Sequence, residues 1–291
     1  MLYRCTNCLK NHESLIDHSN CCSSSNNKNR SKKYSNKFLS NFTLEWNLNK
    51  TTQFENKNKK VKSSKNFYLR TGKENLDFEG KKVLDAGVGS GRYAIIPLIE
   101  GAEVWGVDFS DAYLVAAENL KKFSKFTSMQ ADIAMLPFAS NQFDYIYTFG
   151  VIHHSPDPEA CLKELYRVLK PGGELCVTVY PSFGIYYTSR FIRKITTRIP
   201  IKLLYILTSI YTILFYHLYK YLFIKHTLLG RLIPISTSDS FKEALLDTYD
   251  IYSPQYQHTF HTHELYQILD NIGFKEITPR PQPITMTAMK L

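Results

Sequence analysis

Short apolar runs alternate with helical periodicity through the middle of the chain. The runs predict buried strands at 83–84, 104–107, 143–149 and 174–180. Apolar positions three and four residues apart predict helices at 92–100, 111–122 and 159–169. Strands that alternate with helices of about three turns are typical of a parallel sheet whose two faces are both covered by helices.

A different pattern closes the chain. Helical periodicity over Thr262–Ile272 is followed by apolar segments at Phe274–Thr278 and Ile284–Met289, which are joined by the proline-containing segment Pro279–Pro283. So short a connection cannot contain a crossover helix, and it predicts an antiparallel hairpin.

The beginning of the chain is mostly polar. Residues 19–37 and 50–65 are rich in Ser, Asn and Lys and cannot bury enough apolar surface to offset the entropy lost on ordering. Between them, Phe42–Trp46 forms an apolar island, which we expect to dock on the main body.

Composition and charge narrow the class of protein. The 291 residues are 44% hydrophobic, which excludes a wholly disordered chain. The net charge of +10 is unevenly distributed: residues 1–75 hold 15 basic and 5 acidic side chains, and residues 181–235 hold 8 basic and none that are acidic. The intervening region is acidic, so the uniform basicity of a nucleic-acid-coating protein is absent, and a nucleic-acid partner is not expected.

The sharpest chemical signal is the segment Val83–Arg92, in which an apolar run leads into Gly87-x-Gly89-x-Gly91. Glycine allows the backbone to turn with unusual dihedral angles and lets a ligand approach closely. A dinucleotide site would place glycine rather than arginine at position 92. Asp85 would repel a pyrophosphate, but it suits the ammonium group of an amino acid.

Two further acids follow predicted strands. Asp108 ends the second strand, where a carboxylate can accept both hydroxyls of a ribose. Asp132 lies at the next strand end and can accept a hydrogen bond from an adenine amine. The strand 143–149 then leads to His153 and His154, and Leu165–Gly173 predicts a helix end with a Pro-Gly-Gly stop.

These segments, in this order, resemble the class I S-adenosylmethionine-dependent methyltransferases, in the broad group of ubiquinone and menaquinone methyltransferases. The resemblance covers residues 80–180 and, more loosely, 262–291. It implies an α/β, Rossmann-like seven-stranded sheet of order 3-2-1-4-5-7-6, with strand 7 antiparallel, helices on both faces and a helical insertion after strand 5. It also implies S-adenosylmethionine as the cofactor. The residues expected to bind it are Asp85, Gly87, Gly89, Gly91, Asp108, Asp132, Ile133 and Phe149.

A general base is required only where the acceptor is a poorly acidic hydroxyl or amine. His153 is the first candidate, because imidazole titrates near neutral pH. His258 is the second, within a segment, 247–258, whose counterpart follows the insertion in a subset of these methyltransferases. We expect that segment to form the wall of the acceptor pocket, with His258 or Tyr256 in contact with the acceptor.

The insertion 181–235 is the most individual part of the chain. Leu203–Tyr219 is 17 residues without formal charge, between basic clusters. A spanning helix at this place would divide the domain between the two sides of a membrane, so we reject it. Two interpretations of the insertion remain: an apolar lid over the pocket, or helices that lie on an anionic membrane surface. Both favour a lipophilic or membrane-presented small-molecule acceptor.

The first residues carry a candidate metal site. Cys5, Cys8, His18 and Cys21 have the spacing of a small zinc knuckle, and the alternative is cysteines that bind no metal. Six cysteines are too few for a disulfide scaffold, and residues 1–10 contain no apolar run of the kind that opens a secretory signal. We therefore expect a cytoplasmic protein, which would associate with the membrane surface if the insertion 181–235 is a membrane contact and not a lid.

We divide the chain into five parts: a cysteine-containing arm (1–37), a docking segment (38–80), a cofactor-binding core (81–180), a basic apolar insertion (181–235) and the end of the methyltransferase domain (236–291). Methyl transfer to a small acceptor by in-line displacement is the function expected. The alternatives are methylation of RNA or protein with the help of the basic arm, and a protein that binds the cofactor without catalysis.

Overall fold

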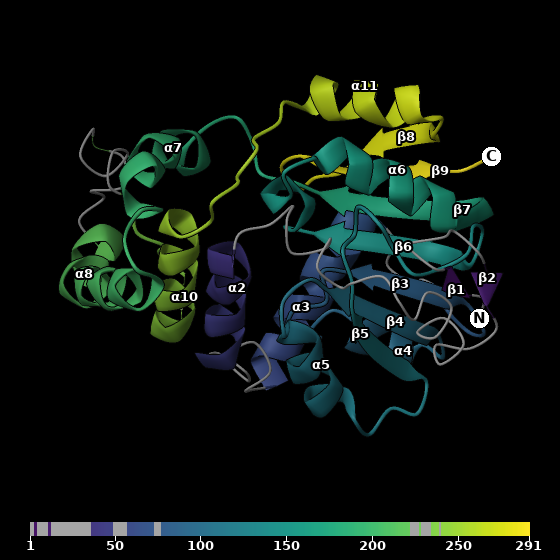
Figure 1. Cartoon of the computed structure of the whole chain (residues 1–291), viewed down its shortest axis with the longest axis horizontal. Coiled ribbons are helices and arrows are strands. Elements are labelled where there is room, and N and C mark those ends of the chain that lie inside the picture. Colours follow the sequence, from purple (N-terminus) through teal and green to yellow (C-terminus); the bar gives the residue numbers. More distant parts are fainter. Residues whose placement is uncertain are drawn as a thin grey trace, which may run out of the picture.

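A seven-stranded sheet forms the centre of the computed structural model (Figure 1). The structure describes residues 3–4, 11–12, 36–48, 57–72, 77–221, 227, 234–238 and 240–291. The strands of the sheet are β3 (Lys82–Ala86), β4 (Glu103–Asp108), β5 (Phe126–Gln130), β6 (Phe143–Phe149), β7 (Leu169–Thr178), β8 (Lys275–Pro279) and β9 (Thr285–Met289). A separate antiparallel pair joins β1 (Tyr3–Arg4) to β2 (Asn11–His12).

The order of the strands in the sheet is β5-β4-β3-β6-β7-β9-β8. The first five are mutually parallel, and β9 runs antiparallel to both β7 and β8. If the strands β3 to β9 are renumbered 1 to 7 in chain order, the order in the sheet is 3-2-1-4-5-7-6, with strand 7 antiparallel. The predicted fold class is therefore confirmed. The predicted hairpin at the end of the chain is also confirmed.

Alternate residues of the strands face opposite sides of the sheet and build two apolar cores. Leu84 and Ile146 belong to one core, and their chain neighbours Val83 and Tyr145 belong to the other. The helices of the sheet are α3 (Lys57–Thr71), α4 (Ile95–Ile99), α5 (Ala112–Leu120), α6 (Pro158–Val168) and α11 (Thr262–Ile272). Both faces of the parallel sheet are therefore covered, as the apolar strands require.

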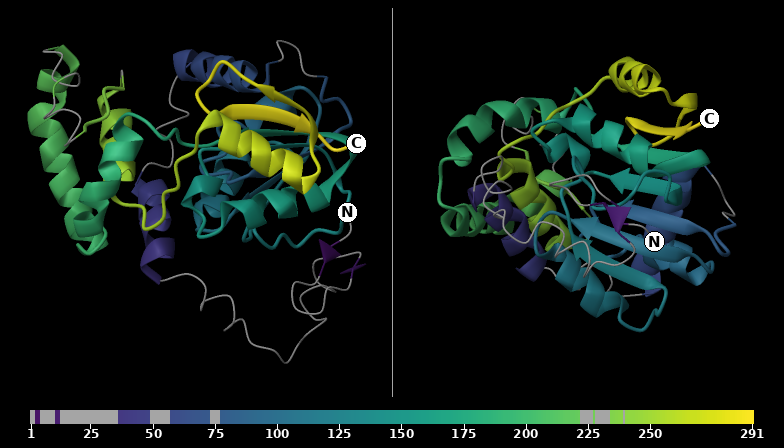
Figure 2. Two further views of the ribbon diagram at one scale, coloured as in Figure 1. Left: turned by 90° about the horizontal axis from the view of Figure 1, so that it is seen from above. Right: turned by 45° about the vertical axis from the view of Figure 1, so that its right-hand side comes forward.

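The remaining helices stand together beyond the carboxyl ends of the parallel strands (Figures 1 and 2). They are α2 (Asn36–Leu48), α7 (Ile185–Thr196), α8 (Ile201–Tyr221) and α10 (Phe241–Tyr252). α10 packs against both α7 and α8, and α2 contacts α5 and α8. The helical group thus combines the insertion with a segment that precedes the sheet and another, α10, that the sequence assigns to the last part of the chain.

Three local predictions need correction. The polar run 50–65 was expected to stay unordered, but α3 begins within it, at Lys57. The helix expected at 92–100 is only Ile95–Ile99, because turns occupy the residues before it. The Pro-Gly-Gly sequence does not separate a helix from a strand: α6 ends at Val168, and β7 begins at once at Leu169. Phe143 pairs with Leu169 and Tyr145 pairs with Glu174, so the Pro-Gly-Gly residues form a bulge within the strand pairing.

Candidate functional site

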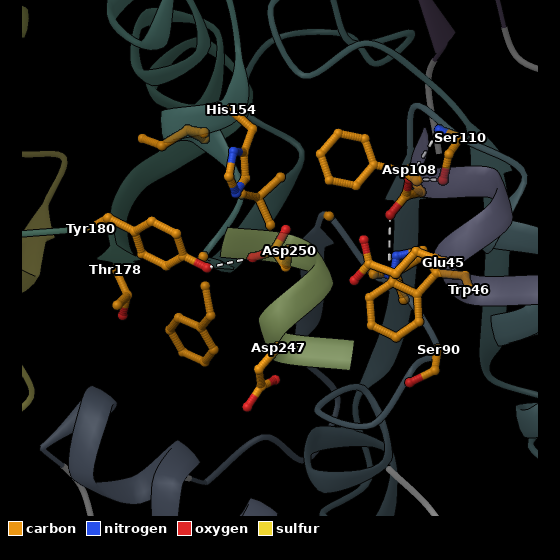
Figure 3. Close-up of a pocket in the computed structure, with 18 of the residues that line it drawn as sticks. Glu45, Trp46, Ser90, Asp108, Ser110, His154, Thr178, Tyr180, Asp247 and Asp250 are labelled. Carbon is orange, nitrogen blue, oxygen red and sulfur yellow. Dashed lines mark hydrogen bonds between the residues drawn. The ribbon is translucent and has the colours of Figure 1, made fainter. Parts of the chain in front are cut away.

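A cavity of about 730 Å³ lies where β3, β4 and β6 end, beneath α2 and α10. Figure 3 shows Asp108 and Ser110 on one side, Tyr180 and His154 on the other, and Asp247 and Asp250 of α10 between them. Parallel α/β sheets bind ligands at this edge, and the volume lies within the range of small-molecule sites. The cleft that the sequence predicts is therefore open and not filled by side chains.

The turn after β3 depends on glycine. Gly87 and Gly89 have φ angles of 96° and 50°, which other residues rarely adopt. A Cβ on Gly87 would collide with the side chain of Val151, and one on Gly89 would come within 2.9 Å of the Trp46 ring. The turn therefore presents bare backbone to the cavity on one side and to α2 on the other.

Gly91 has a different role from its neighbours. It does not line the cavity that the described residues form, and a Cβ there would lie 2.8 Å from the Leu120 side chain. Its bare backbone, at a φ of 84°, lets the turn pack closely on α5. Of the eight residues predicted to bind the cofactor, the other seven line the cavity.

Asp108 is held by a network at the end of β4. Its Oδ2 accepts a hydrogen bond from the Gly89 amide at 3.1 Å, and its Oδ1 accepts two from Ser110, from the amide at 3.0 Å and the hydroxyl at 2.8 Å. Burial raises the pKa of Asp108, while these hydrogen bonds act in the opposite direction. The carboxylate is thus oriented before any ligand arrives, as recognition of a ribose diol requires.

Asp85 is the penultimate residue of β3 and is almost completely buried. Burial raises its pKa to about 7, although the hydrogen bond from the Tyr147 hydroxyl, at 2.9 Å, lowers it. The nearby Asp108 raises the pKa further. A cation is the ligand group that would stabilise this carboxylate most.

Asp132 lies beyond the end of β5, where its Oδ1 accepts a hydrogen bond from the Ala134 amide at 2.9 Å. Ile133 and Phe149 add apolar surface to the same cavity. The Phe149 ring is itself packed edge-on against Phe67 and Tyr93. An acid and two apolar side chains are the groups that a purine ring with an exocyclic amine needs.

The two histidines predicted to be catalytic do not reach the cavity that the described residues enclose. His153 is fully buried, with its ring centroid 3.8 Å from that of Tyr180, and burial lowers its pKa well below the usual range. His258 is exposed. It contacts His153 through its backbone amide, which donates a hydrogen bond to the His153 carbonyl oxygen. Successive residues of the short helix η2 (Ile152–His154) point in different directions, so His154 lines the cavity in place of its neighbour.

Three acids of the helical group line the cavity but were not among the predicted site residues. Asp247, Asp250 and Glu45 line the cavity opposite the strand ends. Asp250 accepts a hydrogen bond from the Tyr180 hydroxyl at 2.8 Å. Burial raises the pKa of Glu45 well above its usual value, and the charge of Asp250 adds to the effect. The segment 247–258 was expected to form the wall, but its aspartates line the cavity and its histidine does not.

α2 is attached to α10 through one amide side chain. Asn41 donates a hydrogen bond to the Ser253 hydroxyl at 2.9 Å and accepts one from the hydroxyl of Tyr249. On the same helix, Phe42, Glu45 and Trp46 line the cavity. The segment 42–46, an apolar island in the sequence, therefore supplies part of the site.

The predicted zinc ligands Cys5, Cys8, His18 and Cys21 lie outside the residues that the structure describes. Within the described ranges, no group of three or more His, Cys, Asp or Glu side chains is arranged to hold a metal ion.

The residues present fit S-adenosylmethionine. Bare backbone at Gly87 and Gly89 leaves space that a Cβ would fill. Asp108 is oriented to accept hydroxyl donors, and Asp85 suits a cation. A carboxylate for the diol, a carboxylate for the ammonium group and an apolar surface for the purine are the chemistry that this compound presents.

Comparison with known proteins agrees with the site. A family model described as a methyltransferase domain matches residues 84–177, so the predicted resemblance is confirmed over this part of the chain. Cycloartenol-C-24-methyltransferase 1 of Oryza sativa subsp. japonica is 36% identical over 106 residues, which are 35% of this chain and 30% of that protein. Phosphoethanolamine N-methyltransferase 2 of Caenorhabditis elegans is 38% identical over 36% of this chain and 25% of its own length.

A third relative, the ubiquinone biosynthesis O-methyltransferase of Pseudomonas putida (strain W619), is 33% identical over 35% of this chain and 45% of its own. The chain thus matches less than half the length of each of these relatives. Among solved structures, a SAM-dependent methyltransferase from Aquifex aeolicus has a TM-score of 0.47 at 16% identity, over 86% of this chain and 98% of that one. Phosphoethanolamine N-methyltransferase 2 of Haemonchus contortus, solved with S-adenosyl-L-methionine, has a TM-score of 0.45 at 20% identity, over 92% and 46%.

Proposed function

We propose that the protein transfers a methyl group from S-adenosylmethionine to a small lipophilic acceptor held between η2, α10 and the strand ends. The observation that carries the proposal is a single cavity that contains both the Asp85–Asp108 edge and the side chains of His154, Tyr180 and Asp250. A cofactor at that edge and an acceptor beside these side chains would share one enclosed space.

The cofactor supplies a methyl group on a positively charged sulfur, already activated for displacement. The chain's own residues then have two tasks, to orient the two ligands and to exclude water. Apolar side chains from several elements support the second task and favour a lipophilic acceptor. Those on the cavity wall include Phe42, Phe149, Ile152, Ile235, Leu246 and Ile251.

His154 is suited to hold the proton that a hydroxyl or amine acceptor loses. Its Nδ1 lies 3.0 Å from the carbonyl oxygen of Tyr256, which can only accept a hydrogen bond, so Nδ1 carries the ring proton. The other nitrogen, Nε2, is then the basic one. Burial lowers the pKa of His154, which favours the neutral ring at neutral pH.

Cofactor carrying a labelled methyl group, incubated with the protein and a fractionated cell extract, tests the proposal. Label should enter a lipid-soluble, small-molecule fraction, and Asp108→Ala should abolish the transfer. Asp111→Ala is the matched control, because Asp111 is exposed three residues further along and does not line the cavity. Label in RNA or protein would replace the proposed acceptor, and cofactor binding without any labelled product would indicate a protein that binds without catalysis.

A further inference from the structure

The helix α8 has its more polar face inside. The residues buried along it are Leu204, Thr208, Thr212, Tyr216 and Tyr219, and all but the first carry hydroxyls. Their spacing of three and four residues places them on one side, toward α10. The Tyr216 hydroxyl donates to the carbonyl oxygen of Ser238 at 2.6 Å, so this face is satisfied within the protein.

The opposite side carries large apolar side chains. We call it the outer face of α8, and it consists of Leu203, Ile206, Leu207, Ile210, Ile213 and Leu214, each 46–62% exposed. Figures 1 and 2 agree that α8 lies at the end of the molecule farthest from the sheet. A helix that exposes its apolar stripe and buries its hydroxyls indicates an apolar environment outside the protein.

Exposed basic side chains occur in the segment just before α8 and at its beginning. Arg190 and Lys194 are exposed on the neighbouring helix α7, beside the exposed apolar side chains of Phe191 and Ile195. Lys202 is exposed at the beginning of α8. The whole segment 181–235 contains eight basic residues and no acidic one, so an anionic surface is the complementary one.

We infer that the outer face of α8, with the basic side chains of α7, is a docking surface on which the protein lies on an anionic lipid bilayer. The apolar stripe would enter the boundary between headgroups and acyl chains, and Arg190 and Lys194 would remain among the lipid phosphates. The inference does not depend on the proposed methyl transfer, although it explains how a lipophilic acceptor would reach the cavity.

Two other uses of α8 fit the structure less well. The stretch Ile201–Lys220 has the length and the mean hydropathy, 1.5, of a membrane span. However, one side of it packs on α10, which carries Asp247 and Asp250 into the cavity, so crossing a bilayer would draw those acids toward the hydrocarbon. A lid would have to cover the cavity, and no α8 side chain is among the described residues that line it.

Flotation of the full chain with lipid vesicles tests the inference. The protein should bind vesicles of equal parts phosphatidylcholine and phosphatidylserine, and bind pure phosphatidylcholine much more weakly. Replacing Ile210 and Leu214 by Gln should abolish binding. The same change at Ile99 and Leu114, which are 70% and 55% exposed on α4 and α5, should have no effect. Arg190→Gln and Lys194→Gln should each weaken binding to the anionic vesicles about fivefold.

The orientation of α8 relative to the membrane is tested by measuring how deeply two of its positions enter the bilayer. A tryptophan probe is introduced in two separate variants, Leu203→Trp and Leu218→Trp. The two positions are roughly 22 Å apart along α8, at 1.5 Å per residue. Brominated lipids should quench both at the same shallow depth if the helix lies in the plane of the membrane, and at different depths if it spans. Absence of binding to either vesicle would overturn the inference. So would a dimer in sedimentation that Ile210→Gln and Leu214→Gln dissociate, because the face would then belong to a second copy of the chain.

Discussion

The hydroxyl of Tyr147, on β6, donates a hydrogen bond of 2.9 Å to Oδ2 of Asp85, on the adjacent strand β3. Both side chains are buried, and burial raises the pKa of Asp85 to about 7. Tyr147 is the side chain that most favours the ionised form, since its hydrogen bond lowers that pKa. The protonation of Asp85 is therefore balanced near neutral pH in the protein without ligand.

This balance predicts that cofactor binding releases a proton. Below pH 7 Asp85 is largely protonated, and an ammonium group bound beside it favours the carboxylate, so the proton must leave. Calorimetric titration with S-adenosylmethionine in two buffers of different ionisation enthalpy should show proton release near pH 6.5 that disappears above pH 8. Asp85→Asn should abolish the difference between buffers. Equal heats in both buffers throughout that range would contradict the assignment.

The same shift predicts a trend in stability. A carboxyl whose pKa is raised by folding stabilises the folded state at low pH, and that contribution is lost as pH rises from 3.8 to about 7. Glu45, whose pKa is also raised by burial, acts in the same direction. Glu45→Gln should increase the free energy of unfolding at pH 7, because the amide carries no charge that burial would penalise. The free energy of unfolding is measured by urea titration. The control Glu118→Gln, at an exposed position of α5, should leave this free energy unchanged.

Gly89→Ala should prevent cofactor binding. Its φ of 50° and the Trp46 ring 2.9 Å from the added Cβ both oppose a side chain. Gly80→Ala is a matched control, because Gly80 also has a positive φ, of 68°, but nothing within 4 Å of its Cβ. Both variants should lose roughly 1–2 kcal/mol of stability. Only Gly89→Ala should lose affinity for S-adenosylmethionine in calorimetry, and equal affinities would show that the turn does not touch the cofactor.

His154→Gln should lower kcat by roughly 10²- to 10⁴-fold while cofactor affinity stays unchanged, because glutamine cannot take a proton. Burial lowers the pKa of His154, so wild-type activity should be constant above pH 6.5 and fall at more acid pH, as the ring becomes protonated. The variant's rate should not follow that profile. His263→Gln, on the exposed start of α11, should behave as wild type. An acceptor with an acidic proton would make kcat insensitive to His154, contradicting its proposed role.

The hydrogen-bonded pair of Tyr180 and Asp250 should affect binding of the acceptor and leave binding of the cofactor unchanged. Tyr180→Phe removes the 2.8 Å hydrogen bond but keeps the ring that packs, tilted, against the rings of His153 and Tyr186. We expect the acceptor KM to rise about tenfold, consistent with the loss of one hydrogen bond to a charged group. Tyr266→Phe, at a residue 45% exposed on α11, is the control. A change in cofactor affinity instead would place this pair at the wrong end of the cavity.

The sequence predicts the sheet and the cofactor edge because both depend on local patterns. Apolar runs and the glycine turn specify strands and their ends without reference to distant residues, and Asp85 and Asp108 follow from that placement. The choice between His153 and His154 depends on the direction of successive side chains in a short helix, which spacing does not show.

The end of the cavity that we propose for the acceptor was harder to predict, because it is assembled from distant segments. Asn41 of α2 bonds to Tyr249 of α10 and to Ser253, directly after that helix, across more than 200 positions of sequence, and no periodicity encodes such a contact. The segment 247–258 was expected to form a wall of the pocket, but its sequence does not show which of its side chains face the cavity, and these are Asp247 and Asp250.

The helix α2 touches both ends of the cavity. Trp46 covers Gly89 at the cofactor edge, and Asn41, little more than one turn away, holds the acceptor wall. A rigid helix cannot shift at one of these points without shifting at the other. If binding of one ligand moves α2, the affinity for the other ligand should change as well, and the coupling should be equal in both directions.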